Sequence, residues 1–205
     1  MKTARLALVL ALLSVARCAA AAGPDPLPPP SILDSSPAFP GYGVDNVLDG
    51  NLVTDFASQG QGTNTFIDFD FGAPTTIGQV VVTDRTTSGG GNGTFVGGQF
   101  DKVTAFDLIF GDDPSFATST ATLHVQSPYV NRPPTSNGTE DFQTTVAVPN
   151  VTAQYVRFDV TAAAGANPGA AEFQFSGPVV PEPSCAALLA LAPLAFARRL
   201  CRRDK

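Results

Sequence analysis

Residues 66–71 read Phe-Ile-Asp-Phe-Asp-Phe, and this stretch decides the fold class. Ile67, Phe69 and Phe71 fall on one face of an extended chain, and the two aspartates between them fall on the other face. Strict alternation of apolar and polar residues is typical of a half-buried antiparallel strand. We therefore predict a strand over this stretch, with its apolar side chains in a core.

Further runs of the same kind lie on both sides of this strand. They are short, rich in β-branched or aromatic residues, and separated by Gly, Pro, Asn and Ser: 77–83, 103–110, 142–148, 155–160 and 173–175. No stretch between these runs keeps a helical period. The fifteen phenylalanines and the absence of tryptophan suit a core filled from two inner sheet faces. The sequence therefore predicts an all-β domain over residues 32–177, most simply a β-sandwich.

The amino terminus has the layout of a secretory signal peptide. Lys2 and Arg5 precede an apolar run over 6–15, and small residues follow up to Ala22. We expect residues 1–22 to form a signal helix that is removed. A lipoprotein signal would acylate Cys18 instead, but the arginine before that cysteine does not fit such a signal. A proline-rich linker follows over residues 23–31.

The carboxyl terminus, residues 178–205, has three parts in order: a Pro-Glu-Pro hinge, an uncharged and mostly apolar run over 185–197, and an arginine-rich end. As a helix this run spans roughly 20 Å, less than the ~30 Å hydrocarbon core of a membrane. The alternative is a buried carboxy-terminal helix, which the basic cluster disfavours. The order of parts resembles the sorting signal of bacterial PEP-CTERM proteins. That resemblance implies processing by an exosortase, transient or lasting membrane anchoring, and sorting residues Pro181, Glu182, Pro183, Arg198 and Arg199.

Between the two terminal signals the chain is strongly acidic and has no cysteine. Residues 23–180 hold sixteen carboxylates against four strong bases, a net charge of −12. Such a surface repels phosphate backbones, so nucleic acid is not an expected partner. All three cysteines lie in the terminal signals, so we expect no disulfide in the domain. Its stability must come from the core, and a bound metal ion would add to it.

A polar loop precedes the first clear strand and carries oxygen-bearing side chains. Residues 44–58 include Asp49-Gly50-Asn51 and then Thr54. Hard cations such as Ca²⁺ take six to eight oxygen ligands, and a tight turn brings side-chain and backbone oxygens together. The spacing of an EF-hand is absent. The alternative is a plain turn in which Asp49 bonds to the nearby backbone.

This loop, the strands that follow it, and the end of the domain resemble a discoidin or F5/8-type-C domain. The matching segments are 44–58, 66–72, 77–82, 155–160 and 170–175, with Phe56 where the family commonly has Trp. The resemblance implies a galactose-binding-like jelly-roll fold, like that of many carbohydrate-binding modules. It also implies a structural calcium held by Asp49, Thr54 and Glu172, with backbone oxygens near Val44 and Asn51. We expect the two ends to meet because the first and last strands lie side by side.

Sugar sites in such modules offer a stacking ring and a few polar groups at a loop end. The candidates here lie in or beside loops: Tyr42, Arg85, Phe95, Tyr129 and Arg132. Each has a plainer alternative role in packing or on the surface. For Arg85 that role is a surface ion pair. We expect Arg157 to cover one sheet face and His124 to lie on a strand surface.

Catalysis is poorly supported by the residues available. The domain has no cysteine nucleophile, a single histidine and two glutamates. We therefore expect an exported, non-catalytic module at the cell surface or in the extracellular matrix, one that binds carbohydrate and holds a structural Ca²⁺. Two alternatives remain open: a structural or adhesive matrix protein without a small-molecule site, and a glycoside-active enzyme.

Overall fold

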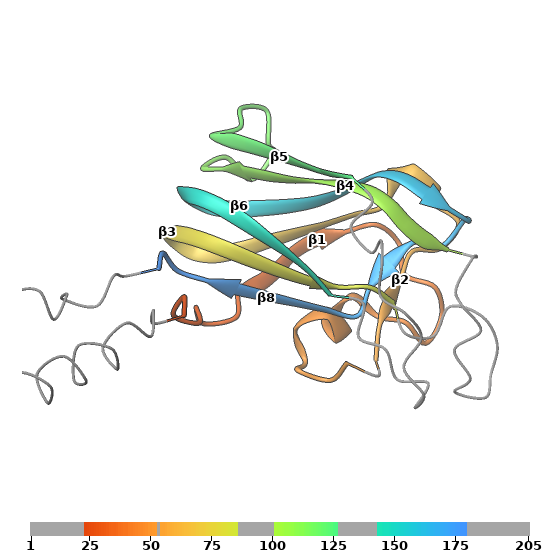
Figure 1. Ribbon diagram of the computed structural model, residues 1–205. Helices are drawn as coiled ribbons and strands as arrows, with labels where there is room; N and C mark the ends of the chain where they lie inside the picture. Colours follow the sequence, from red (N-terminus) through yellow and green to blue (C-terminus); the bar gives the residue numbers. More distant parts are fainter. Residues whose placement is uncertain (1–22, 53, 86–100, 127–142, 180–205) are drawn as a thin grey trace, which may run out of the picture. The chain divides into compact units, whose positions relative to one another are not determined.

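We describe the protein from a computed structural model covering residues 23–52, 54–85, 101–126 and 143–179. Pro24–Pro178 form one compact unit. Its strands are β1 (Ser31–Ser35), β2 (Phe56–Ala57), β3 (Phe66–Thr83), β4 (Lys102–Gly111), β5 (Ala121–Gln126), β6 (Gln143–Ala164), β7 (Gly169–Ala170) and β8 (Glu172–Ser176) (Figure 1). Two short 3₁₀ helices, η1 (Val44–Leu48) and η2 (Gly62–Asn64), lie in the loops around β2.

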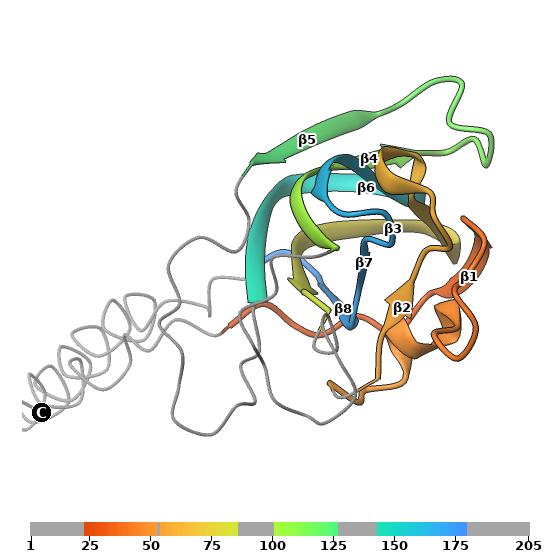
Figure 2. The same cartoon turned by 90° about the vertical axis from the view of Figure 1, so that its right-hand side faces the viewer.

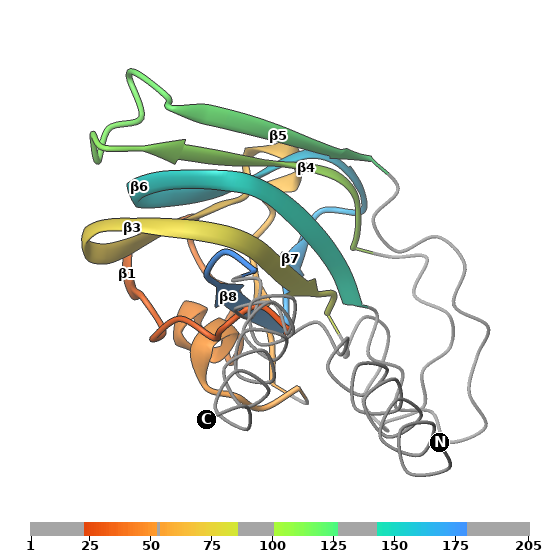
Figure 3. The same cartoon turned by 60° about the vertical axis from the view of Figure 1, so that its left-hand side comes forward.

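Two long strands, β3 and β6, pair with each other over most of their length and turn back together at one end (Figures 1 and 3). The bend in β3 begins after Phe71 at Gly72, whose φ of 73° suits glycine. In β6 it falls at Pro149-Asn150, where Asn150 also has a positive φ of 52°. The sequence predicted two separate strands in place of each bent strand, one before the bend and one after it. That division is wrong, because each pair of runs belongs to one bent strand.

The bend creates the two layers of a sandwich. The first arm of β3 pairs with β1 and with the second arm of β6, and β4 and β5 follow beyond β6. The second arm of β3 pairs with β8 and with the first arm of β6. The all-β sandwich expected from the alternating runs is confirmed.

Phenylalanine rings from both layers meet in the core. Phe69 of β3 lies 4.9 Å from Phe173 of β8, and Phe158 of β6 lies 5.1 Å from the same ring, measured between centroids. Phe175 contacts Phe69 at 5.2 Å. Each such pair adds about 0.5–1.5 kcal/mol beyond the burial of its area. Phe71, predicted on the same face, is only half-buried, and it packs edge-on against Phe175 at the margin of the core.

The larger layer consists of β1, the first arm of β3, the second arm of β6, β4 and β5, and its outer face is polar. Asp68 points away from the core, yet it is only 2% exposed, because Arg157 covers it with two hydrogen bonds of 2.7 Å. The guanidinium lies between the rings of Phe66 and Phe116, 4.7 Å from each centroid. Arg157 therefore covers a sheet face as predicted. His124 lies on the surface of β5, also as predicted, and its Nδ1 is 2.7 Å from Asp107 Oδ1.

One end of the sandwich is closed by the small pair β2–β7 (Figure 2). Phe56 pairs with Ala170, and the backbone at Gly169 approaches so closely that an added Cβ would lie 2.0 Å from the oxygen of Phe56. Only glycine allows that approach. The smaller layer consists of β8, the second arm of β3 and the first arm of β6. The stretch predicted as a linker extends this layer at its β8 edge, where Leu27 N donates to Phe175 O.

Candidate binding site

The acidic loop between η1 and β2 folds around the side chain of Asp49. Its Oδ1 accepts a hydrogen bond from Asn51 N at 2.7 Å, and its Oδ2 accepts one from Thr54 Oγ1 at 2.8 Å. Gly50, between them, has a φ of 74°. The turn predicted for this motif is therefore present, and it brings the carboxylate and the hydroxyl together as expected.

Glu172 reaches this loop from the first position of β8. It is 4% exposed, and its Oε2 accepts a hydrogen bond from Gly50 N at 3.1 Å. Burial raises the pKa of Glu172 to about 7, the bond from Gly50 opposes the rise, and the charge of Asp49 adds to it. The three residues named as calcium ligands, Asp49, Thr54 and Glu172, thus lie around one loop.

The oxygen atoms of these three residues are of the types that bind a hard cation. They supply two carboxylates and a hydroxyl, and the turn adds backbone carbonyls, the oxygen types that Ca²⁺ prefers. A buried carboxylate beside a second carboxylate is costly without a compensating positive charge. Within the described residues, no group of three or more His, Cys, Asp or Glu could hold a metal ion. The calcium site therefore depends on Thr54 and on carbonyls, and it stays a prediction.

The prediction that the acidic loop and Glu172 meet because the first and last strands lie side by side is wrong. In the part of the chain that the structure describes, β1 and β8 do not pair with each other, because each pairs with a different arm of β3. The two ends are joined instead by the pairing of β2 with β7, which lie just after the acidic loop and just before β8.

Arg85 follows the end of β3, and the alternative to its ligand-binding role, a surface ion pair, is wrong because its ion pair is buried. It is 6% exposed and buried against Asp55, which is 1% exposed. Its Nε donates to Asp55 Oδ2 at 3.1 Å, and its Nη1 donates to the carbonyl oxygen of Asn167 at 2.5 Å. Asp101 Oδ2 lies 3.9 Å from Nη1. The sequence could not show this burial, because the partners are far from Arg85 along the chain.

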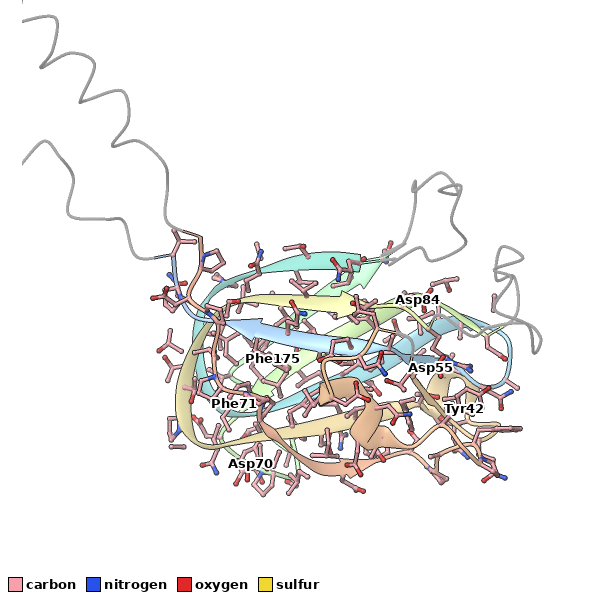
Figure 4. The ribbon with its side chains drawn as sticks, turned by 90° about the horizontal axis from the view of Figure 1, so that it is seen from below. Tyr42, Asp55, Asp70, Phe71, Asp84 and Phe175 are labelled. Atoms are coloured by element: carbon pink, nitrogen blue, oxygen red, sulfur yellow. The ribbon has the colours of Figure 1, made fainter. Side chains whose placement is uncertain are left out.

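Tyr42 lies over Arg85, with its ring centroid 5.4 Å from the guanidinium carbon. Phe39 packs edge-on against Tyr42 at 6.0 Å and is 43% exposed. The loop that carries both rings is held to β2, since Phe39 N donates to Ala57 O at 2.7 Å. Figure 4 shows Tyr42, Asp55 and Asp84 toward one end of the sandwich, and Asp70 and Phe71 toward the other.

Of the predicted ligand-binding residues, Tyr42 and Arg85 are therefore brought together. Phe95, Tyr129 and Arg132 lie outside the described residues, as do the sorting residues of the tail. Sequence reasoning missed Phe39, although its spacing from Tyr42 across Pro40-Gly41 could have indicated an aromatic pair on one turn. It also missed Asp55, Asp101 and Asn167, for which no local signal exists.

The comparison with protein families decides the classification. The model of the F5/8 type C domain matches residues 31–173, more than half of the chain. The chain belongs to the F5/8 type C family. The resemblance seen in the loop and in the closing strands is thereby confirmed, and so is the galactose-binding-like jelly roll. None of the curated proteins compared with it matches.

Solved structures share the fold of this F5/8 type C domain at low identity. The lectin domain of lectinolysin, complexed with Lewis B antigen, is 18% identical, with a TM-score of 0.53 over 72% of this chain and 92% of that one. The module CBM32-3 from a family 31 glycoside hydrolase of Clostridium perfringens has the same identity and TM-score, over 72% and 90%. A Streptococcus pneumoniae fucose-binding module is 14% identical, with a TM-score of 0.50 over 73% and 97%.

The two ends of the chain lie outside the F5/8 type C domain. Among the described residues, no helix is both long and apolar enough to cross a membrane. The apolar run over 185–197 and the signal over 1–22 lie outside those residues.

Proposed function

We propose that the protein is an exported, non-catalytic module that binds extracellular carbohydrate at the end bearing Phe39 and Tyr42. The observation that carries this proposal is the half-exposed aromatic pair above Arg85, at the loop end of an F5/8 type C sandwich. Ring faces stack on the C–H faces of sugars, and nearby polar groups fix their orientation.

The solved structures that share the fold support this choice of ligand class. One was solved with Lewis B antigen, and another is a fucose-binding module of Streptococcus pneumoniae. Such modules use the sandwich as a scaffold and the loops at one end for recognition. The single histidine is on the surface of β5, paired with Asp107, an arrangement that suits a surface ion pair better than a catalytic group.

We further propose a structural Ca²⁺ held by Asp49, Thr54 and Glu172, with backbone oxygens of the same loop. The ion would neutralise the two carboxylates and fix the loop just before Asp55, the partner of Arg85. A structural ion at this place stabilises the candidate site without touching the ligand.

Export and sorting are proposed from the two ends of the sequence. The signal-like residues 1–22 would direct secretion, and the tail would be processed near Pro181-Glu182-Pro183 by an exosortase-type enzyme. The arginines at the end would hold the tail at the cytoplasmic face until then.

Binding of the full-length protein to a glycan array, with and without added Ca²⁺, tests the main proposal. We expect retention on at least one polysaccharide, stronger when Ca²⁺ is present. If the protein binds no glycan, including the polysaccharides of the native matrix, the structural or adhesive alternative is favoured. Release of reducing sugar from a bound glycan would show an enzyme instead.

A further inference from the structure

Arg85 and Arg157 are the strong bases whose side chains the structure describes, and both are paired within the protein. Arg157 is held by Asp68 on the outer sheet face. Arg85 is held by Asp55, Asn167 and the ring of Tyr42. Of these two bases, only Arg85 lies at the proposed sugar-binding end, where it is the described base that a charged ligand would meet.

The geometry around Arg85 is that of a residue holding loops together. Its side chain donates hydrogen bonds to Asp55, just before β2, and to Asn167, in the loop just before β7, and its guanidinium supports the ring of Tyr42. At 6% exposure it presents almost no surface to a ligand. A guanidinium recognises carboxylate or sulfate through its planar fork, and here that fork is directed at protein oxygens.

Among the described side chains around Arg85, carboxylates outnumber bases. Asp55 and Asp101 lie on its guanidinium side, and Asp84 Oδ1 accepts a hydrogen bond from the backbone N of Arg85. In the described part of this end, one positive charge therefore lies near three carboxylates. A ligand that carries its own negative charge meets repulsion there, which the buried guanidinium does not offset.

We propose that Arg85 is a positioning residue and that this end of the molecule selects uncharged sugars over sulfated, sialylated or uronic ones. The inference rests on the proposed carbohydrate-binding function and specifies its ligand class. Recognition comes from the ring faces of Tyr42 and Phe39, and Arg85 acts through Tyr42 by setting the orientation of that ring.

A matched glycan panel tests the selectivity with the full-length protein. Each neutral glycan is printed beside its sulfated counterpart, and galacturonan oligosaccharides are printed both as methyl esters and as free acids. We expect the neutral members to bind at least about tenfold more tightly than their charged counterparts, with little dependence on salt. Preference for the charged members would overturn this inference but leave carbohydrate binding intact. Binding to neither class would overturn both.

A variant at Asp101 tests the part that the surrounding negative charge plays in this preference. Asp101→Asn removes a charge and retains an oxygen that can accept the bond from Asn167 N, and asparagine tolerates the φ of 71° at this position. We expect the preference for neutral over charged glycans to narrow by at least about twofold, and an unchanged ratio would contradict the proposal.

A double-mutant cycle between Arg85→Lys and Tyr42→Ala tests whether Arg85 acts through the ring. Arg85→Lys should weaken neutral-glycan binding in the wild-type background and have little further effect once Tyr42 is alanine. Additive losses would mean that Arg85 contacts the ligand directly. The glycan panel with the wild-type protein remains decisive if Arg85→Lys does not fold.

Discussion

Glu172 links the stability of the fold to pH, and a bound metal ion would change that link. Its pKa is raised from 4.5 to about 7, so the folded state holds the proton more tightly than the unfolded chain does. In metal-free protein this stabilising contribution is fully present below about pH 4.5 and is lost as the pH rises through about 7. A bound cation would reverse the effect by favouring the charged carboxylate.

The substitution Glu172→Gln tests this linkage, because glutamine keeps an oxygen for Gly50 N and cannot ionise. In metal-free buffer the wild-type melting temperature should fall, relative to that of the variant, between about pH 4.5 and pH 7. Parallel melting curves across this range would show that Glu172 does not titrate as described.

Residue roles were predictable only where the local sequence determined them. The Asp49-Gly50-Asn51 turn and the Thr54 hydroxyl lie within a few residues, so their contact followed from turn chemistry. Arg85 was misread because its burial depends on Asp55 and Asn167, which only the folded chain brings near. A polar residue just after a strand is exposed more often than not, and here the tertiary contacts override that expectation.

At the scale of elements, alternation predicted the strands well and the bends poorly. The predicted runs at 66–71 and 77–83 both lie in β3, because the strand pairing continues around Gly72 and Pro74. Glycine and proline usually end a strand, so the sequence could not distinguish a bend from a loop. The two-residue strands β2 and β7 are too short to carry a period, and they were missed.

The β2–β7 pair is the element that joins the acidic loop to β8, and Gly169 permits its close approach. In Gly169→Ala the new Cβ would lie 2.0 Å from the oxygen of Phe56, so the pair must separate. We expect a loss of about 1–3 kcal/mol in unfolding free energy, measured by denaturant titration.

The matched control for this prediction is Gly43→Ala. An added Cβ at Gly43 meets nothing within 4 Å, and the φ of −66° there suits alanine. Equal unfolding midpoints for the two variants would show that the β2–β7 pair is not tightly packed.

At the scale of the whole molecule, a bound Ca²⁺ should appear as a stabilising ligand. A ligand at 100 times its dissociation constant adds about 2.7 kcal/mol to the folded state, which is several degrees in melting temperature for a domain of this size. Chelator should therefore lower the wild-type melting temperature and leave Asp49→Asn less affected. An unchanged wild-type midpoint, with no metal found by elemental analysis, would exclude the ion.

Processing of the carboxyl-terminal tail is a separate prediction. If the tail is processed near Pro181-Glu182-Pro183, mass spectrometry of the extracellular protein should find a carboxyl terminus close to that hinge. A terminus intact through Lys205 would instead mean a lasting anchor.

Glycan binding by the wild-type protein and by Tyr42→Ala, measured side by side, tests the central claim most directly. Tyr155→Ala, which removes a ring from β6 rather than from the loop end, is the matched control. We predict that wild-type and Tyr155→Ala bind the same neutral glycan, and that Tyr42→Ala binds it about tenfold more weakly, a loss of about 1.4 kcal/mol. Equal binding by all three proteins would place the sugar site elsewhere, and binding by none would contradict the proposed function.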